Sequence, residues 1–381
     1  MLKISQAITD TRAYLCLDCG KCTVACPVSR YDSAYSPRKL VYSAVCGHGA
    51  ELLKNGQLWS CLTCSMCEER CQSGVLYTEL IKSLRAEAYA LGNSGQCTHG
   101  GALQSLMHIM TADHLTQNRL DWLDRSLKTT TKSDVLYFAG CQPYFDVLFS
   151  DIGVSTLTTA RGAIKLLNQV NIVPAVLPNE RCCGHDLLWA GDTAHFLTLA
   201  EHNLREISQA GARQVVTTCP ECYYTLKVEY PRYLGSLSFE VIHISQLLAA
   251  KVAKGELKFR RLAKKVTYHD PCRLGRFSGI YDEPRAVIKA IPGLELIEMP
   301  RSRKNALCCG TQAWINCGAI NKQIQNERLL EASFTGANIL LTSCPKCQIH
   351  LKCAMSDGRL TKELGIEIQD LTSLAAKALV V

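Results

Sequence analysis

Near the beginning of the sequence stands the stretch Cys16-Leu-Asp-Cys19-Gly-Lys-Cys22-Thr-Val-Ala-Cys26-Pro27. Its thiols follow the spacing C-x-x-C-x-x-C-x-x-x-C. The same spacing returns at Cys61, Cys64, Cys67 and Cys71. A gap of two residues lets a tight turn direct successive sulfur atoms toward one point, so each run is suited to surround a common centre.

This spacing is typical of bacterial ferredoxins with a pair of 4Fe–4S clusters, in which the fourth thiol of each run ligates the other cluster. Zinc sites usually present two C-x-x-C pairs instead, and disulfides need an oxidising compartment, so both alternatives are less favoured. Gln72 follows the second run where Pro27 follows the first, but proline does not ligate iron. We therefore expect one cluster at Cys16, Cys19, Cys22 and Cys71, and a second at Cys61, Cys64, Cys67 and Cys26.

The composition indicates a globular protein that uses its cysteines as ligands. A chain of 381 residues suggests two or three domains, and 22 cysteines are far more than packing requires. The first residues lack the basic start and apolar run of an export signal, and no apolar stretch is long enough to cross a membrane. We therefore expect a cytoplasmic protein with reduced thiols. The formal net charge of +8 is spread along the chain, which does not favour nucleic-acid binding.

Residues 1–92 are expected to form an α-helical ferredoxin-like domain with both clusters. Pro37 suits the first turn of one helix, and residues 76–91 show the apolar spacing of another. Residues 93–132 contain many chain breakers and are expected to be a connector with a helical piece at 103–110. We expect its histidines to be surface or packing residues rather than ligands, and they are His99, His108 and His114.

The rest of the sequence contains an internal repeat. Residues 214–227 match residues 339–352, and Cys182-Cys183-Gly184 matches Cys308-Cys309-Gly310. Both copies of each motif occur in the same order along the chain. The repeat therefore predicts two duplicated modules, at residues 133–255 and 256–381.

Each module alternates short β runs with helical stretches, which is typical of an α/β fold with a parallel sheet. In the first module the β runs are at 135–138, 172–176 and 215–217, and helices are expected at 155–169 and 192–210. Functional turns of such sheets lie at the carboxyl ends of the strands. Four cysteines directly follow a predicted strand and should lie on that edge of each sheet: Cys141, Cys219, Cys272 and Cys344.

Each module contains a single cysteine, then Cys-Cys-Gly, then Cys-Pro-x-Cys. Five thiols are one more than an ordinary 4Fe–4S cubane needs. Gly184 and Gly310 would let the backbone pass close to a bulky inorganic core. Pro220 and Pro345 suit the first turn of a helix, whose N-terminal N–H groups would favour anionic sulfur.

The paired Cys-Cys-Gly modules resemble the catalytic subunit of heterodisulfide reductase. The front part resembles the small ferredoxin subunit of that enzyme, in Cys26-Pro-Val-Ser-Arg-Tyr-Asp-Ser-Ala-Tyr-Ser-Pro37-Arg38-Lys39, in Trp59-Ser-Cys61 and in Arg70-Cys71. The two subunits would be fused in one chain, and the resemblance covers nearly the whole sequence. It implies an oxidoreductase that acts on sulfur groups within a complex.

The resemblance further implies that each module binds a noncubane 4Fe–4S cluster, in which two fused cubes share an iron and a sulfide. No ligand is missing, whereas related electron-relay subunits of glycolate, lactate and glycerol-3-phosphate oxidoreductases often have degenerate modules. A disulfide would lie between the modules and be split, with one sulfur on each cluster. The ligands would be Cys141, Cys182, Cys183, Cys219 and Cys222 in one cluster, and Cys272, Cys308, Cys309, Cys344 and Cys347 in the other.

Reductive cleavage of a disulfide also needs two protons. His185 and His269 lie close in sequence to module cysteines and could deliver a proton near neutral pH, or they could only hydrogen-bond a cluster sulfur or the backbone. Arg273 and Arg276 could meet an anionic part of a substrate, or they could be solvated loop residues. We expect the remaining cysteines to be packed as small hydrophobic side chains, and they are Cys46, Cys97, Cys317 and Cys353.

Two functions fit these features. The first is an iron–sulfur subunit of a heterodisulfide-reductase-like complex, which passes electrons from two cubane clusters to two noncubane clusters that reduce or form a disulfide. The second is a pure electron-transfer subunit linked to a flavin, a quinone or benzoyl-CoA reductase, and a zinc or regulatory protein is less favoured. No G-x-G-x-x-G follows a predicted strand. We therefore expect a separate flavoprotein subunit of heterodisulfide reductase type as partner, with or without further redox subunits.

Overall fold

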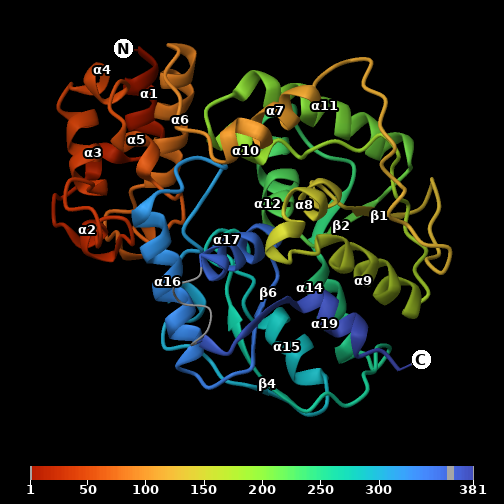
Figure 1. Cartoon of the computed structure of the whole chain (residues 1–381). Coiled ribbons are helices and arrows are strands. Elements are labelled where there is room, and N and C mark those ends of the chain that lie inside the picture. Colours follow the sequence, from red (N-terminus) through yellow and green to blue (C-terminus); the bar gives the residue numbers. More distant parts are fainter. Residues whose placement is uncertain (1, 358–363, 381) are drawn as a thin grey trace. The chain divides into compact units, whose positions relative to one another are not determined.

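The computed structural model describes residues 2–357 and 364–380. The chain divides into two compact units, and each is assembled from segments that are distant in sequence (Figure 1). The first unit comprises the residues up to Thr111 with Gly184–Leu197 and Leu307–Gln325. The second comprises Ala112–Cys183, Thr198–Ala306 and the residues from Asn326 onward. The boundaries proposed at residues 92, 132 and 255 stay predictions.

The described part of the first unit is built from short helices, as expected for an α-helical ferredoxin-type domain. Ser36 caps the predicted helix at Pro37, because its Oγ accepts a hydrogen bond from the Lys39 N–H at 3.3 Å. No helix among the described residues of the whole chain has the length and apolar character needed to cross a bilayer. The helices are α1 (Leu2–Asp10), α2 (Lys21–Ala25), α3 (Pro37–Val45), α4 (Gly49–Leu52), α5 (Gln57–Ser60), α6 (Tyr77–Ala90), α7 (Ala102–Ile109) and α10 (His185–Trp189).

The second unit contains two parallel sheets, one in each module, which confirms the predicted α/β class with duplicated parallel sheets. The first sheet has the strand order β1-β2-β3, and the second has the order β5-β4-β6-β7. Every strand pair in both sheets is parallel. The strands are β1 (Val135–Phe138), β2 (Gln214–Thr217), β3 (Glu240–His243), β4 (Lys264–His269), β5 (Leu294–Leu296), β6 (Ile339–Thr342) and β7 (Glu367–Asp370).

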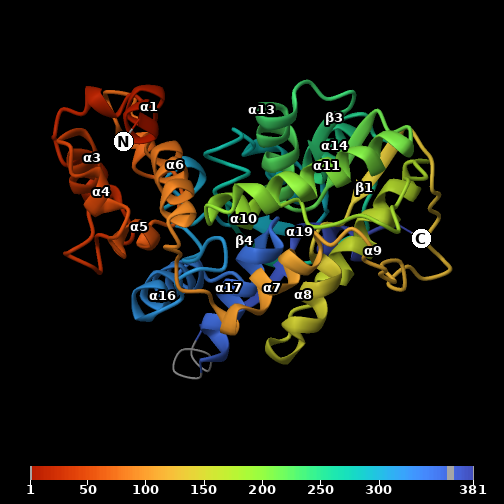
Figure 2. The ribbon, with the colours of Figure 1, turned by 90° about the horizontal axis from the view of Figure 1, so that it is seen from above.

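Helices of the two modules pack on each other in a reciprocal way. Helix α9 of the first module contacts α19 of the second (Figures 1 and 2). Helix α14 of the first module contacts α15 of the second (Figure 1). In each contact, a helix near the start of one module meets the last helix of the other. These helices are α9 (Thr156–Gln169), α14 (Ile244–Ala253), α15 (Asp282–Ala290) and α19 (Leu371–Lys377).

Two long helices, α11 and α16, have residues in both units. The predicted helices at 155–169 and 192–210 are confirmed by α9 and α11 within one residue at each end. The remaining helices are α8 (Gln142–Leu148), α11 (Thr193–Gln209), α12 (Pro220–Tyr224), α13 (Tyr230–Leu234), α16 (Ala319–Ser333) and α17 (Pro345–Ser356).

One hydrophobic core serves both sheets. Val216 of β2 and Leu341 of β6 are fully buried, and they belong to one continuous apolar cluster with Tyr137 and Tyr268. Burial of apolar surface is the main favourable term in folding. The two modules therefore stabilise each other and are not independent domains.

One predicted β run is wrong. Residues 172–176 form no regular strand, and Ala175 makes only isolated bridges to Thr130 and Leu136. Pro174 lies beside Ala175 and lacks the N–H that a strand ladder requires. The segment therefore contacts the edge of the first sheet for a residue or two without extending it.

Buried side chains cap the last helix of each module at matching positions. His243 precedes α14, and its Nδ1 accepts from the Ser245 N–H at 3.3 Å. Asp370 precedes α19, and its Oδ1 accepts from the Thr372 N–H at 2.7 Å. The other carboxylate oxygen of Asp370 has no hydrogen-bond partner within the described residues. Burial lowers the pKa of His243 to about 4 and raises the pKa of Asp370 to about 7.

The raised pKa of Asp370 predicts a pH-dependent stability. In the folded protein Asp370 keeps its proton up to a pH of about 7, whereas the unfolded chain releases it at a lower pH. The free energy of unfolding therefore decreases as the pH rises toward about 7. Asp370→Asn stays neutral and can still cap α19. Its melting temperature should therefore exceed that of the wild type by more at pH 8 than at pH 5, as followed by circular dichroism. Asp151→Asn, at an exposed position, is the control, and an equal difference at both pH values for Asp370→Asn would contradict this account.

Candidate functional site

Four thiols from the two front runs line one pocket of the first unit. Three come from the second run, and the fourth, Cys26, comes from the first run. All four are buried. The structure thus brings together the four cysteines that the sequence assigns to one cluster: Cys26, Cys61, Cys64 and Cys67.

The thiols of this pocket have raised pKa values. Burial raises the pKa of Cys26 to about 12, with further increases from Cys64 and Cys61. Burial also raises the pKa of Cys67 and of Cys61, although the nearby Arg85 opposes the rise at Cys61. Metal ions stabilise thiolates in such surroundings, so four convergent buried thiols fit an iron–sulfur cluster well.

Arg85 holds the start of the second run in place. It lies on α6 and is fully buried. Its guanidinium donates to the carbonyl of Cys61 at 2.7 Å and to the carbonyl of Leu58 at 3.1 Å. It also donates to the carbonyl of Trp189 at 3.1 Å. Sequence reasoning missed this residue, because nothing in its helical context distinguishes it from a surface arginine.

Both runs fold into the same backbone turn. Asp18 and Gly20 of the first run have φ values of 53° and 76°, and Thr63 and Ser65 of the second run have 44° and 61°. These residues occupy equivalent positions on either side of the second thiol of each run. A positive φ is unfavourable for residues other than glycine, so its recurrence at both runs indicates a common geometry that directs successive sulfur atoms inward.

The other four front cysteines are more exposed. Cys22 lies on α2, and Cys71 directly follows the 3-10 helix Glu68–Arg70 that packs against α2. Burial raises the pKa of Cys22, and nearby Cys16 raises it further. Cys19 is exposed. The structure therefore places Cys16 near Cys22, and the packing of the 3-10 helix against α2 brings the two runs together. That Cys16, Cys19, Cys22 and Cys71 bind one cluster stays a prediction.

Five thiols of the first module gather in the second unit. The Cys182 thiol lies within hydrogen-bonding reach of those of Cys141 and Cys183, and the Cys222 thiol within reach of those of Cys183 and Cys219. The contact with Cys182 and burial raise the pKa of Cys141 and of Cys183, although the Cys222 contact opposes the rise at Cys183. The contacts with Cys183 and Cys219, together with burial, raise the pKa of Cys222. The five residues that the resemblance assigns to one cluster are thus brought together.

Local structure explains how these thiols are presented. Cys141 and Cys219 lie within three residues of the ends of β1 and β2, as the sequence predicts. Pro220 occupies the first turn of α12, directly after Cys219. Gly140 has φ 62°, and a Cβ atom there would lie 2.8 Å from the Cys222 sulfur. Only glycine therefore leaves room for that thiol.

A buried ion pair fixes the turn that carries Cys141. Glu180 accepts from the Gly140 N–H at 2.7 Å and from the Ala139 N–H at 3.2 Å. Arg119 donates to Glu180 at 2.7 Å and also to the carbonyl of Gly140. Burial raises the pKa of Glu180 overall, against the opposing effect of Arg119. The backbone before Cys141 is therefore held at both its donors and its acceptor.

The second module also has a buried ion pair close to its first cysteine, formed by different residues. Arg285 of α15 donates to the two carboxylate oxygens of Asp270 at 2.7 and 3.0 Å, and it also pairs with Glu298 at 2.5 Å. Asp270 accepts from the Arg303 N–H at 2.7 Å and stands two residues before Cys272. Sequence reasoning missed both ion pairs, although Glu180 and Asp270 each lie close to a module cysteine.

The thiols of the second module are divided between the units. Cys272, Cys344 and Cys347 belong to the second unit, whereas Cys308 and Cys309 belong to the first. Cys344 caps α17, because its sulfur accepts from the Cys347 N–H at 3.5 Å. The grouping of these five residues around one cluster stays a prediction from the sequence.

The glycines of the Cys-Cys-Gly motifs approach a helix. Gly184 has φ 81°, and a Cβ atom there would lie 2.7 Å from the ring of Phe196 on α11. Gly310 has φ 88°, and a Cβ atom would lie 2.9 Å from the Asn321 carbonyl on α16. Atoms of α11 and α16 therefore require glycine at these two positions, and the expected close passage along an inorganic core stays a prediction.

Both candidate proton donors are buried. His185 is the first residue of α10, and its Nδ1 lies 3.0 Å from Asp186 Oδ1. His269 ends β4, and its Nδ1 accepts a hydrogen bond from Arg328 Nε at 3.0 Å. A neutral His269 must therefore carry its proton on Nε2. Each histidine has a fixed orientation, and a role in proton transfer stays a proposal.

The two arginines after Cys272 have structural contacts. Arg273 is buried, and its guanidinium lies 4.0 Å from the ring centre of Phe277. Arg276 donates to the carbonyls of Lys304 at 3.2 Å and Ala306 at 2.7 Å. Of the two alternatives for these arginines, that of a solvated loop residue is therefore wrong for Arg273.

The four remaining cysteines are not all packed. Cys46 and Cys97 are exposed, so the expectation of packed side chains is wrong for these two. Cys46 directly follows α3 as its C-cap residue. Cys317 and Cys353 are partly buried.

Two family descriptions match the chain. Residues 12–75 match the family described as 4Fe-4S dicluster domain. Residues 135–227 and 266–352 each match the family described as Cysteine-rich domain. The matches cover the two front runs and both copies of the repeat.

Known proteins resemble the chain over most of its length. One subunit of the dihydromethanophenazine:CoB–CoM heterodisulfide reductase from Methanosarcina barkeri is 33% identical over 331 residues, which are 84% of this chain and 77% of that protein. EtfAB:quinone oxidoreductase from Syntrophomonas wolfei is 29% identical over 315 residues, which are 76% of this chain and 42% of that protein. A crystal structure of a hypothetical protein from Helicobacter pylori has a TM-score of 0.57 at 11% identity, covering 90% of this chain and 68% of that one, which shows a similar fold alone.

The buried ion pair beside Cys141 yields a stability prediction. Arg119→Met removes the cation and leaves Glu180 buried with its charge uncompensated, which should cost about 3–5 kcal/mol of unfolding free energy. Denaturant unfolding under anaerobic conditions measures this loss. Arg213→Met is the matched control, because Arg213 and its partner Asp134 are 83% and 72% exposed, and its effect should stay below about 1 kcal/mol. Equal losses for the two variants would disprove the positioning role of the buried pair.

Proposed function

Because this chain belongs to the heterodisulfide reductase family, we propose that it is the subunit at which a disulfide is reduced or formed. The family consists of iron–sulfur subunits of oxidoreductases, and a redox role follows from membership. The finer proposal is that electrons pass between two cubane 4Fe–4S clusters at the front and two noncubane 4Fe–4S clusters in the modules.

We propose that eighteen of the 22 cysteines hold these clusters. The convergence of Cys26 with the second run and the shared turn geometry of the two runs support the front assignments. The cubane ligands would be Cys16, Cys19, Cys22, Cys71, Cys61, Cys64, Cys67 and Cys26, and the noncubane ligands would be Cys141, Cys182, Cys183, Cys219, Cys222, Cys272, Cys308, Cys309, Cys344 and Cys347.

The observation that carries the proposal is the gathering of five thiols around Cys182 and Cys183 in the second unit. A cubane cluster needs four thiolates. A fifth thiol at the same place favours a larger assembly, and adjacent cysteines can reach different metal ions. The Glu180–Arg119 pair supports this proposal, since it fixes the Cys141 turn before any group is bound.

Reduction of a disulfide takes up two electrons and two protons and gives two thiols. When bound, iron–sulfur clusters supply the electrons one at a time. We propose His185 and His269 as the proton donors, because each is a buried imidazole that lies close in sequence to module cysteines and is oriented by a defined partner, Asp186 or Arg328. The reverse reaction would use the same groups as bases.

We propose a flavoprotein electron-transfer subunit of heterodisulfide reductase type as the partner, with or without further redox subunits. The relative from Methanosarcina barkeri is named as one subunit of its enzyme, and no nicotinamide-binding fingerprint occurs in the sequence. We also propose a cytoplasmic location, because the ligands must stay reduced.

A second candidate is a pure electron-transfer subunit without a disulfide substrate. The similarity to EtfAB:quinone oxidoreductase favours this candidate. If the region that the two proteins share only passes electrons in that relative, it could do the same in this chain. Intact sets of five thiols in both modules favour the first candidate. The two differ in whether a disulfide oxidises the reduced protein.

Iron analysis tests the ligand assignments. Four clusters of four irons predict about sixteen iron atoms per chain in protein prepared without oxygen. Cys183→Ser should lose about four of them and the electron paramagnetic resonance signal of one cluster, because a hydroxyl is a poor iron ligand. Cys46→Ser, at an exposed position, should keep them all. Zinc in place of iron in the wild type, or an unchanged iron count in Cys183→Ser, would refute the assignment.

Rapid mixing tests the reaction. Dithionite-reduced protein, freed of excess reductant, should be reoxidised by a heterodisulfide within one turnover, with release of two thiols per two electrons. Cys183→Ser should be reduced at its front clusters yet react far more slowly, whereas Cys46→Ser should react like the wild type. Inertness of the wild type toward every disulfide tried, with fast oxidation by a quinone or flavoprotein, would favour the relay function instead.

A further inference from the structure

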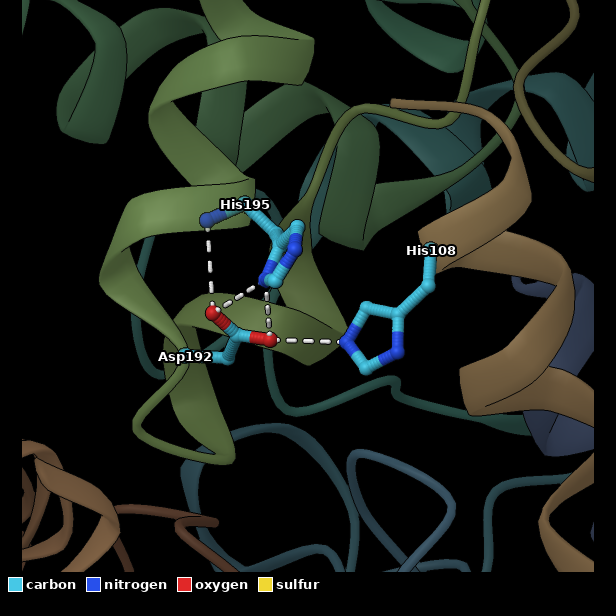
Figure 3. Close-up of side chains that lie close together, drawn as sticks. All are labelled: His108, Asp192 and His195. Carbon is cyan, nitrogen blue, oxygen red and sulfur yellow. Dashed lines mark hydrogen bonds and ion pairs between the residues drawn. The ribbon is translucent and has the colours of Figure 1, made fainter. Parts of the chain in front are cut away.

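A second group of ligand-type side chains lies in the first unit, outside the thiol clusters. His108 is in the last turn of α7, Asp192 directly precedes α11, and His195 is in the first turn of α11 (Figure 3). Asp192 is buried with its side chain 3% exposed, whereas the side chains of His108 and His195 are 40% and 44% exposed. The sequence suggested that His108 is a surface or packing residue, but the structure aims it at a buried carboxylate.

Both imidazoles point at the same carboxylate. Nε2 of His108 lies 2.7 Å from Asp192 Oδ2, and Nδ1 of His195 lies 2.8 Å from Oδ2 and 2.9 Å from Oδ1. The ring centres of the two histidines are 4.5 Å apart. One ligand atom from each residue falls within 4.8 Å of the other two. Two imidazole nitrogens and a carboxylate oxygen therefore converge on one small region.

The carboxylate is oriented before any ion arrives. Asp192 Oδ1 accepts from the His195 N–H at 3.3 Å, as a helix N-cap does, and the Tyr89 hydroxyl donates to Oδ2 at 2.9 Å. Burial alone would raise the pKa of Asp192, but hydrogen bonds from His195, His108 and Tyr89 lower it overall. Asp192 is thus an ionised, fixed ligand. Burial and the bond to Asp192 raise the pKa of Tyr89 to about 12, so its hydroxyl stays a donor.

Helix capping alone does not account for this arrangement. A cap requires the carboxylate and the N–H groups of α11, and it does not need an imidazole from α7. Bringing two imidazoles to a 4.5 Å ring separation is unfavourable when both are protonated. It is favourable when both are neutral with their protons on the other ring nitrogen, because the two lone pairs can then bind one cation that replaces the N–H···O hydrogen bonds to Asp192. Imidazole and carboxylate are standard ligands of Zn²⁺.

We propose that His108, Asp192 and His195 bind one divalent transition-metal ion of the Zn²⁺ type, separate from the iron–sulfur clusters. Three protein ligands leave a fourth position for water, and the half-exposed imidazoles give the ion access from solvent. The Tyr89 hydroxyl orients the carboxylate from behind, as outer ligands do in zinc sites. The ion would tie the end of α7 to the start of α11 within the first unit.

Zinc binding tests this proposal on the full chain with its clusters loaded, so that the thiols are occupied. After incubation with ZnCl₂ and desalting, the wild type should retain one zinc per chain with unchanged iron, as measured by mass spectrometry. His108→Ala and His195→Ala should each lose that zinc. Tyr89→Phe should weaken zinc binding by roughly 10–100-fold. His114→Ala, at an exposed histidine that is not a member of this group, should bind like the wild type.

Anomalous diffraction at the zinc edge locates the ion in crystals of the wild type, and this readout does not depend on any variant folding. A peak between the two histidines supports the proposal. Absence of retained zinc, equal retention in His108→Ala and His195→Ala with normal iron content, or a peak only at cysteines would overturn it. None of these results depends on disulfide chemistry, so failure here leaves the proposed reaction untouched, and the reverse also holds.

Discussion

Parallel pairing of β1 with β2, and of β4 with β6, is the constraint on which the thiol arrangement depends. Parallel strands end at the same edge of a sheet, so the turns that follow them lie side by side. Cys141 and Cys219 follow β1 and β2 in this way, and Cys272 and Cys344 follow β4 and β6. Strand pairing therefore brings turns that are far apart in sequence to one edge of each sheet.

The strand pairing places the turns but does not set the conformation of each turn. Buried ion pairs restrict that conformation further. Glu180, paired with Arg119, holds the backbone N–H of Gly140 beside Cys141. Asp270, two residues before Cys272, pairs with Arg285 and accepts from the Arg303 N–H. A buried charge without a partner is costly, so each pair allows few alternative conformations of its turn. The front runs achieve the same end with left-handed backbone at Thr63 and its equivalents. In both cases interactions within the protein fix the backbone that carries the thiols.

The duplication also has a mechanical consequence. The last helix of each module packs against a helix of the other module, α19 on α9 and α14 on α15. The interior strands of both sheets contribute to a single apolar core. Reciprocal contacts of this kind resemble an isologous interface between two copies of one chain. They explain why a repeated sequence that could have formed two domains forms one body, with a cysteine-bearing edge in each half.

The sequence by itself determined the two cysteine runs, the repeat and the parallel α/β class, because spacing, turn residues and hydrophobic alternation can be read directly along the chain. It failed at residues 172–176, where apolar content suggested a strand and Pro174 prevents one. Only the tertiary structure decided that Arg119 meets Glu180, 61 residues away, and that His108 meets Asp192, 84 residues away. Such pairs leave no local trace, since only the packing of the whole chain brings the two side chains together, and a buried carboxylate then needs a partner to offset its loss of water.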